Sequence, residues 1–161
     1  INKFDQLFNN NWLEMMRNKL GLIGEKKEDE ALIGFLLSLM HKYKADYTNT
    51  FCSLMNVEIK KEKMFESKEF IDWQKNWKKR LEGSNKSHEE CLKLMHFSNP
   101  LVIPRNHKVE EALEAANNDD LNPMLKLLKV LEKPYEKQKN ITDYQSPSPN
   151  TDEKYQTFCG T

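Results

Sequence analysis

The chain has 161 residues, the length of one domain, and it is long enough to bury roughly two thirds of the surface that its unfolded form exposes. Charged residues make up 31% of it, but 25 Lys and Arg balance 25 Asp and Glu, so no net charge attracts nucleic acid or an anionic membrane. Its three cysteines lack a CxxC spacing, which excludes a disulfide framework and a zinc module and favours a reducing compartment.

Two helices are predicted in the first part of the chain. Apolar side chains recur every three or four residues between Phe4 and Leu20, which predicts a first helix that ends near Gly21. After an acidic segment the pattern returns and predicts a second helix from about Asp29 to Lys44, with carboxylates near its N-terminus.

The apolar segments are too short for a membrane helix. The longest run, from Phe35 to Met40, is interrupted by Ser38 and falls far below the ~20 residues that a bilayer requires. The basic and apolar regions of a signal peptide do not open the chain. Because the sequence begins at Ile1, in a helical pattern and without an initiator Met, we expect a piece of a longer protein.

Capping residues mark the next three helices. Thr48 is the predicted N-cap of a short third helix, and Ser67 is the predicted N-cap of a fourth, which ends at Gly83. Ser87 and Glu90 have the spacing of a capping box, so a fifth helix is predicted to follow them.

Prolines divide the rest of the helical region. The segment NPLVIP, residues 99–104, is predicted to be an extended crossing, because each proline fixes φ and removes a backbone donor. A sixth helix is predicted from Asn106. Asn122 and Pro123 are the predicted N-cap and first residue of a seventh helix, which Pro134 stops.

The helical periodicity ends after Gln138, and the segment SPSPN is typical of a linker. Strand-like alternation and solenoid repeats are absent from the sequence. We therefore predict an all-α fold, an irregular antiparallel assembly of about seven helices with an extended Pro-containing crossing. The predicted domains are a helical domain over residues 1–138 and a coil tail over 139–161 that ends in Cys159.

The sequence contains no familiar catalytic or metal-binding motif. Its four histidines form neither an HExxH motif nor a His/Cys pair at ligand spacing, so structural or surface roles are expected for them. They are His41, His88, His96 and His107. No GxGxxG or GxxxxGK[ST] segment is present to hold phosphates. The Asp residues do not pair with an acid or base on a common face, and no catalytic residue is predicted.

Cations gather next to two tryptophans in the predicted fourth helix. The segment from Lys75 to Arg80 lies beside Trp73 and Trp77, whose rings could stack on bases. Acidic residues surround the same segment, so the favoured interpretation is a solvated face with Trp77 in the core.

Arg105 and Asn106 are candidate contacts with another domain. Arg105 directly follows a proline and lies at the start of a predicted helix, where the helix dipole disfavours positive charge. One interpretation is an internal carboxylate partner, either Glu110 or Glu111. The other is a partner group outside this chain.

A long segment near the end of the chain resembles a known family. The sequence NPLVIPRNHKVEEALEAANNDDLNPMLKLLKVLEKPY, followed at the end by YQTFCGT, closely resembles the C-terminal part of the selenoprotein O family of kinase-fold protein adenylyltransferases, found in bacteria and mitochondria. The segments NKLGL and ADYTNTF resemble upstream helices of the same family. The order of these motifs is more specific than any one of them.

The resemblance implies an enzyme with a kinase-like (pseudokinase) fold that transfers AMP from ATP, with Mg or Mn, to protein Ser, Thr and Tyr hydroxyls. Its nucleotide and metal residues belong to an N-terminal region that this chain does not match, so no catalytic, cofactor-binding or metal residue is assigned here. The chain is then a C-terminal scaffolding or regulatory domain of a cytoplasmic bacterial or a mitochondrial enzyme. Its implied partners are the missing kinase-like domain and the substrate proteins, not nucleic acid or a membrane.

The resemblance also implies a redox role for Cys159, which occupies the position of the family's terminal cysteine or selenocysteine. In the family, the terminal residue resembles a redox switch, which can form a bond with a cysteine of the kinase-like part. Pairing by a long flexible tail costs little, because loop-closure entropy grows only logarithmically with loop length. Cys52 and Cys91 lie in apolar periodic segments and are predicted to be buried, inert thiols.

Two other functions stay open at this stage. The chain could be a self-contained helical adaptor that binds a separate protein through one groove, without an enzymatic parent. It could also bind nucleic acid through the lysine-rich region from Lys60 to Arg80, which would show a steep dependence of affinity on salt.

Overall fold

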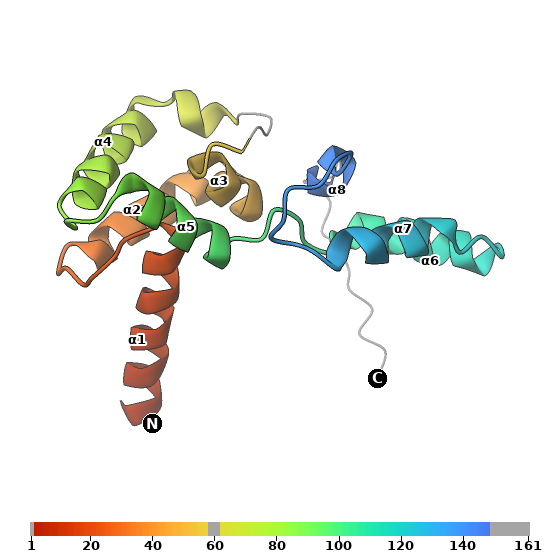
Figure 1. Ribbon diagram of the computed structural model, residues 1–161, viewed down its shortest axis with the longest axis horizontal. Coiled ribbons are helices and arrows are strands. Elements are labelled where there is room, and N and C mark those ends of the chain that lie inside the picture. The colour runs from red at the N-terminus through yellow and green to blue at the C-terminus, as the bar shows by residue number, and fades with distance from the viewer. Residues whose placement is uncertain (1, 58–61, 149–161) are drawn as a thin grey trace. The chain divides into compact units, whose positions relative to one another are not determined.

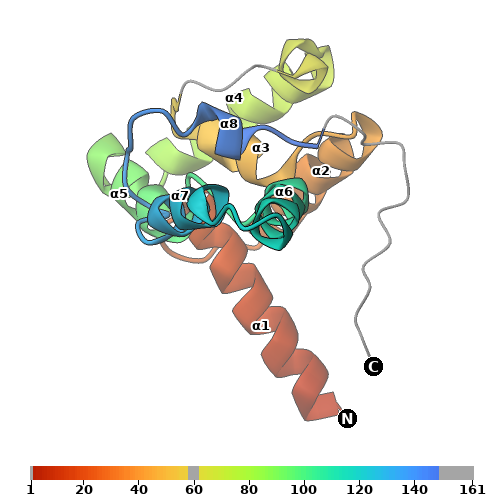
Figure 2. The same ribbon diagram turned by 90° about the vertical axis from the view of Figure 1, so that its right-hand side faces the viewer.

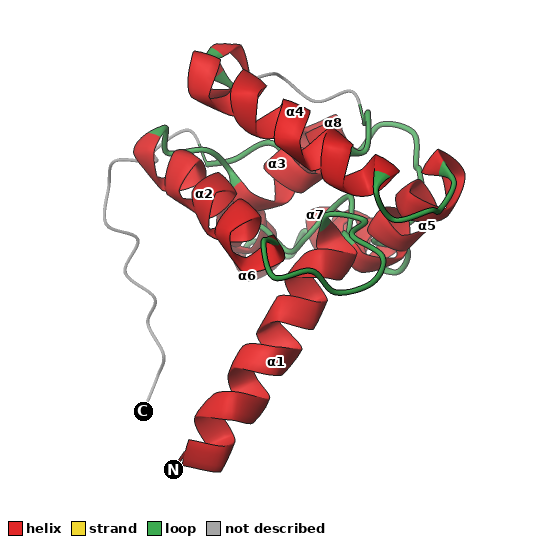
Figure 3. Ribbon diagram, turned by 90° about the vertical axis from the view of Figure 1, so that its left-hand side faces the viewer, coloured by secondary structure: helices red, strands yellow, loops and turns green. Residues whose placement is uncertain are grey.

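The computed structural model of the chain describes residues 2–57 and 62–148, and its regular elements over these ranges are all helical (Figures 1 and 3). In chain order they are α1 (Asn2–Lys19), α2 (Asp29–Lys42), α3 (Tyr47–Leu54), the 3₁₀ helix η1 (Lys63–Glu66), α4 (Lys68–Glu82), α5 (His88–Ser98), α6 (Asn106–Asn117), α7 (Asn122–Leu131) and α8 (Thr142–Gln145). The prediction of an all-α fold is confirmed. The short elements η1 and α8 were not predicted, because each is a single turn without apolar periodicity.

The chain divides into two compact units, Ile1–Leu101 and Val102–Thr161. Their boundary falls inside the segment that was predicted to be extended, where Pro100 and Pro104 interrupt helix formation. The predicted division into residues 1–138 and a tail over 139–161 stays a prediction, because residues 149–161 lie outside the described ranges.

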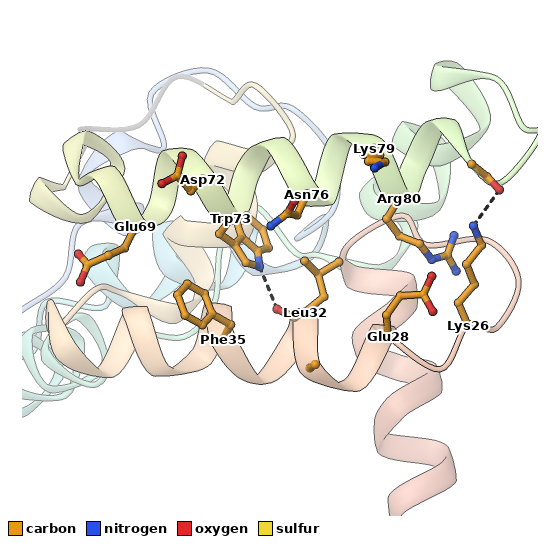
Figure 4. Close-up of a pocket in the computed structure, with 12 residues that line it drawn as sticks. Lys26, Glu28, Leu32, Phe35, Glu69, Asp72, Trp73, Asn76, Lys79 and Arg80 are labelled. Carbon is orange, nitrogen blue, oxygen red and sulfur yellow. Dashed lines mark hydrogen bonds between the residues drawn. The ribbon is translucent and has the colours of Figure 1, made fainter.

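The first unit is built around α2 and α4, which lie side by side and run in opposite directions (Figure 4). Helix α1 packs through its C-terminal half against α2 and α5, and η1 packs against α4. The side chains that face inward are apolar and recur at helical spacing, so each helix contributes one stripe to a common core. The largest fully buried members include Phe51, Met16, Leu20, Leu22, Ile33, Leu36 and Met64.

Most of the predicted helix ends are confirmed. The Ser67 hydroxyl accepts a hydrogen bond from the Phe70 amide at 3.2 Å, and Ser87 and Glu90 form the predicted capping box at the start of α5. The prediction for the third helix was wrong, since Asp46 and not Thr48 is its N-cap. The Asp46 carboxylate accepts from the backbone amide three residues further on at 2.8 Å.

The start of α7 and the end of α1 show two further features. Asn122 is the first residue of α7, and Leu121 occupies the N-cap position that was predicted for Asn122. Gly21 follows α1 with φ +69°, a left-handed conformation that favours glycine. A Cβ on Gly21 would lie 2.9 Å from the Cys91 carbonyl oxygen, so the residue also allows the close approach of α5.

The second unit contains a helical hairpin. Helices α6 and α7 pack against each other and are joined by the short turn at residues 118–121 (Figures 1 and 2). The Lys108 ammonium group lies 2.9 Å from carboxylates of both Glu111 and Asp143, and the second of these pairs ties α8 to α6. The hydrogen bonds of the Lys108 ammonium group to Asp143 and to Glu111 raise its pKa above the ordinary lysine value and outweigh the opposing effect of burial.

Candidate functional site

An open groove of about 770 Å³ lies between α2 and α4 in the first unit (Figure 4). Leu32 of α2 and Trp73 of α4 form its apolar floor, and Phe35 of α2 also lines the groove. Charged side chains stand at its two ends: Glu69 and Asp72 at one end, and Lys26, Glu28, Lys79 and Arg80 at the other. A volume of this size is typical of a binding site.

The floor of the groove is rigid because its tryptophan is fixed. The Trp73 side chain is 3% exposed, and its indole N–H donates to the Leu32 carbonyl oxygen at 2.9 Å. Its ring stacks on Trp77, with 5.8 Å between the ring centroids. Phe35, in contrast, is 49% exposed, which is a large fraction for an aromatic ring in a folded protein. The groove therefore offers one accessible aromatic side chain above a fixed floor.

A buried charge cluster lies beneath the end of the groove that contains Arg80. The Asp29 carboxylate is fully buried and receives Arg80 Nε at 2.6 Å and Nη2 at 3.1 Å. Arg17 Nε on α1 also donates to it at 3.0 Å, and so does the backbone N–H of Lys26 at 2.9 Å. Arg80 additionally donates to the Gly24 carbonyl oxygen at 2.7 Å. One carboxylate thus links α1, the loop before α2, and α4.

The pKa of Asp29 reflects two opposing effects. Burial alone would raise the pKa, because it disfavours the charged carboxylate. The hydrogen bonds from Arg80 and from the Lys26 amide, the charge of Arg80 and the hydrogen bond from Arg17 together outweigh burial and lower the pKa below its ordinary value. The cluster therefore holds a charged Asp29 at neutral pH.

The other charges around the groove differ in how far they are neutralised. Glu69 accepts from the Lys42 ammonium group and from the Tyr43 hydroxyl, which lower its pKa, and Asp72 pairs with Lys75 at 3.2 Å. The Lys26 ammonium donates to the carbonyl oxygen of Gly83 at 3.0 Å, and this contact leaves its charge in place. Lys79 is exposed at the same end.

The predicted interdomain residues Arg105 and Asn106 lie in the second unit. Arg105 precedes α6, and its Nη2 donates to the Gln145 carbonyl oxygen of α8 at 2.9 Å. Asn106 is the exposed first residue of α6. A backbone carbonyl thus contacts the guanidinium group, whereas the interpretations from the sequence were an internal carboxylate or a group outside the chain. Contact of either residue with another domain stays a prediction.

The structure confirms the predicted burial of Trp77, Cys52 and Cys91, but it does not describe Cys159. Trp77 is 5% exposed and donates its indole N–H to the Leu20 carbonyl oxygen, so its predicted place in the core is confirmed. Buried indole rings are not available to stack on bases. Cys52 and Cys91 are buried, as predicted, whereas Cys159 lies outside the described residues.

Over residues 2–57 and 62–148, no three His, Cys, Asp or Glu side chains are grouped so that they could hold a metal ion. In the same ranges, no helix is both long enough and apolar enough to cross a membrane.

Sequence reasoning missed the groove and the Asp29 cluster. The available signal was Arg80, which stands at the same helical face as Phe70, Trp73 and Trp77 in α4 and is therefore a charged residue in an apolar stripe. A cation in such a position requires a buried partner. The partner is 51 residues away in the sequence, so local patterns do not identify it.

Comparisons with known proteins connect the chain to one group of enzymes. The family described as "Protein adenylyltransferase SelO" matches residues 1–132. Three relatives bear the name "Protein nucleotidyltransferase YdiU". The one from Pelagibacter ubique (strain HTCC1062) is 50% identical to this chain, the one from Bacillus cereus (strain G9842) is 47% identical, and the one from Clostridium beijerinckii is 46% identical. Each comparison covers 100% of this chain and 33% of the relative, so the chain spans about a third of the length of these curated relatives.

Proposed function

The chain belongs to the protein adenylyltransferase SelO family, and from this premise we propose that it is the helical scaffolding and regulatory part of an enzyme that transfers AMP from ATP to protein hydroxyl groups. The observation that carries the proposal is that all of the chain matches only a third of each relative. The residues that bind ATP and its metal then belong to the other two thirds.

A surface for contact with the rest of such an enzyme is present on α1. The first half of this helix projects from the other helices of its unit (Figures 1 and 3). Phe4 is 70% exposed and Phe8 is 57% exposed, and their rings stack with 6.3 Å between centroids. Leu7 and Met15 extend the same stripe. We call these four residues the α1 stripe.

The α1 stripe has the properties of a surface that is covered in the complete protein. Its members recur at positions i, i+3, i+4 and i+11, which lie on one side of a helix. Burial of each large apolar side chain contributes about 1.5–3 kcal/mol, so covering the stripe would stabilise a docked domain substantially. Contiguous exposed apolar surface of this kind marks a protein–protein contact.

The described residues of this chain do not fit ATP or its metal. They provide neither a group of metal-ligating side chains nor a glycine-rich loop that could hold phosphates. The proposed role is therefore to support and regulate a nucleotide site that lies elsewhere, with Mg or Mn as the metal there. Bacterial relatives support the bacterial cytoplasm as the compartment.

The alternative function is a self-contained helical adaptor, whose α1 stripe would bind an unrelated protein. The similarity over the complete chain to nucleotidyltransferases favours the first proposal. The two proposals differ in an observable way, because only the first requires the chain for AMP transfer.

AMP transfer by the full-length protein tests the proposal. Label from α-labelled ATP is measured on substrate proteins for the wild type, for Phe8→Glu and for Gln6→Glu, which places the same charge on the other side of α1. We expect Phe8→Glu to lower transfer at least about tenfold, since a charge in a buried contact disrupts docking, and Gln6→Glu to leave it unchanged. Equal activity of all three proteins would contradict a supporting role for this surface.

A second proposal concerns Cys159. We propose that this thiol forms a disulfide with a cysteine outside the chain, with loss of two protons and two electrons to a disulfide or peroxide oxidant. The buried Cys52 and Cys91 are protected from this exchange. The test compares the full-length protein with its Cys159→Ser variant under oxidising and reducing conditions. Identical activity and identical non-reducing gel mobility of the two proteins would overturn the proposal.

A further inference from the structure

We propose that the groove between α2 and α4 binds an amphipathic helix of a separate protein, and that this helix carries acidic side chains in the terminal turn that lies beside Lys26 and Lys79. The inference goes beyond the adenylyltransferase role and does not depend on it. Three observations support the inference: the length of the groove, the pairing of the backbone N–H and C=O groups within α2 and α4, and the distribution of charge along the groove.

The length of the groove favours a polypeptide over a small molecule. Its lining extends along α4 from Glu69 to Gly83, nearly the whole helix, which corresponds to about 20 Å at 1.5 Å per residue. A compact ligand would fill only part of such a length. A partner helix of about four turns would match it from end to end.

The backbone of the groove favours a helix over an extended peptide. One common mode of extended-peptide binding adds a strand to the free edge of a sheet, where unpaired N–H and C=O groups are available. Helices α2 and α4 pair these groups internally, so side chains must provide the recognition. A third helix can lie in the groove between two antiparallel helices. It then contacts both of them through apolar side chains at positions i, i+3, i+4 and i+7.

Phe35 and the floor residues supply the apolar part of this recognition. Phe35 is half exposed, while Trp73 and Leu32 below it are joined by a hydrogen bond and cannot rearrange freely (Figure 4). A rigid aromatic surface loses little conformational entropy on binding. Aromatic anchors of this kind contribute a large share of the affinity at protein interfaces.

The charges of the groove select an acidic partner. Arg80 is neutralised by Asp29, Glu69 by Lys42, and Asp72 by Lys75. Among the lining residues this leaves Lys26 and Lys79 as cations and Glu28 as an anion, all at one end (Figure 4). The excess positive charge at this end complements acidic side chains of a partner, and such complementarity sets orientation and selectivity.

We infer a separate protein as the partner, because the groove and the α1 stripe lie on different parts of the unit and need not share one occupant. Helix α4 lies at the opposite side of the unit from the free end of α1 in all three ribbon views (Figures 1, 2 and 3). A domain docked along the exposed half of α1 does not by itself have to cover the groove, and peptide binding to the full-length protein reports whether the groove stays accessible.

A displayed peptide library tests the inference. Peptides of 16 residues carry leucine at helical spacing and random residues elsewhere, and they are selected on the immobilised 161-residue chain. We expect enrichment of peptides with Asp or Glu in one terminal turn. The strongest peptide is then labelled with fluorescein, and its affinity is measured by fluorescence anisotropy for the chain and for the full-length protein.

Matched variants locate the binding site. Lys79→Glu and Phe35→Ala should each weaken binding at least about tenfold, whereas Lys78→Glu, next to Lys79 but outside the groove, and Phe97→Ala, another exposed Phe, should change it less than twofold. Replacing the acidic residues of the peptide by lysine should restore binding to the Lys79→Glu variant. Circular dichroism confirms that each variant is folded.

The inference would be overturned by a failure to enrich any peptide, by enrichment of basic or uncharged peptides, or by equal effects of Lys79→Glu and Lys78→Glu. Binding to the isolated chain but not to the full-length protein would also overturn it, since the groove would then be occupied within the longer protein. None of these results bears on AMP transfer, which the Phe8→Glu variant tests separately.

Discussion

Arg80 on α4 donates two hydrogen bonds to Asp29, the first residue of α2, and both side chains are buried. Two parallel hydrogen bonds between a guanidinium group and a carboxylate fix both distance and orientation. This pair therefore sets how α4 lies against α2, and with it the width of the groove between them. Arg17 extends the same contact to α1.

Removing the charge of Asp29 should destabilise the first unit. The Asp29→Asn variant would leave Arg80 as a buried cation without its carboxylate, whereas Arg17 would keep Glu25 at 3.3 Å, and breaking a buried ion pair in this way costs about 3–5 kcal/mol. The neighbouring Glu30→Gln variant removes an exposed charge and should change the free energy of unfolding by less than about 0.5 kcal/mol. Urea unfolding followed by circular dichroism measures both. Equal unfolding midpoints for the two variants would contradict the role assigned to Asp29.

The same carboxylate should make stability depend on pH. The folded state lowers the pKa of Asp29 below its unfolded value, which is about 3.9. Its contribution to stability is therefore complete above about pH 4 and is lost as the pH falls through the folded pKa. Urea unfolding of the wild type between pH 2 and pH 7 should show this loss, and Asp29→Asn should show a smaller one. A pH dependence that is the same in both proteins would exclude Asp29 as its source.

Arg105 should hold α8 in the second unit. Replacement of Arg105 by Gln removes the hydrogen bond to the Gln145 carbonyl oxygen, so the single turn of α8 should open more often. Hydrogen exchange of the amides of residues 144–146 should become faster, while exchange in the middle of α7 should stay the same. Asn106→Ala, a change at the exposed next residue, serves as the control. Unchanged exchange in α8 would show that other contacts hold this helix.

The capping box at the start of α5 should contribute measurably to stability. The Ser87 hydroxyl accepts from the Glu90 amide at 3.1 Å, and the Glu90 carboxylate accepts from the Ser87 amide at 2.9 Å. Ser87→Ala should cost about 1 kcal/mol of unfolding free energy, measured by thermal or urea unfolding. The Glu89→Gln variant, which leaves the box intact, is the control and should cost less than half as much. A loss as large in the control would indicate a general charge effect at the helix N-terminus.

The helices and most of their caps could be predicted because they depend on residues that are close in the sequence. The pattern from Phe4 to Leu20 and the box of Ser87 and Glu90 are examples of such local signals. Asp46 was not considered as the cap of α3, and Thr48, two residues further on, also belongs to a residue type that caps helices, so the true cap depends on where the chain turns. Local patterns therefore gave the fold class but not each boundary.

The groove and its charge cluster could not be predicted, because they arise where distant segments meet. Asp29 and Arg80 are far apart in the sequence, and the acidic start of α2 gave no indication that one of its carboxylates is buried. For Arg105, the sequence indicated the need for a compensating group, either an internal carboxylate or a group outside the chain, and the carbonyl of Gln145 was not considered. Backbone acceptors have no sequence signature, so such partners appear only in the structure.

Association of this chain with the rest of the full-length protein tests the central claim most directly. The two parts are expressed separately and mixed, and their affinity is measured by titration calorimetry for the wild-type chain, Phe8→Glu and Gln6→Glu. We predict a stable complex that Phe8→Glu weakens at least about a hundredfold, with Gln6→Glu close to wild type. Absence of a complex with the wild-type chain, or a complex that is indifferent to Phe8→Glu, would contradict the account.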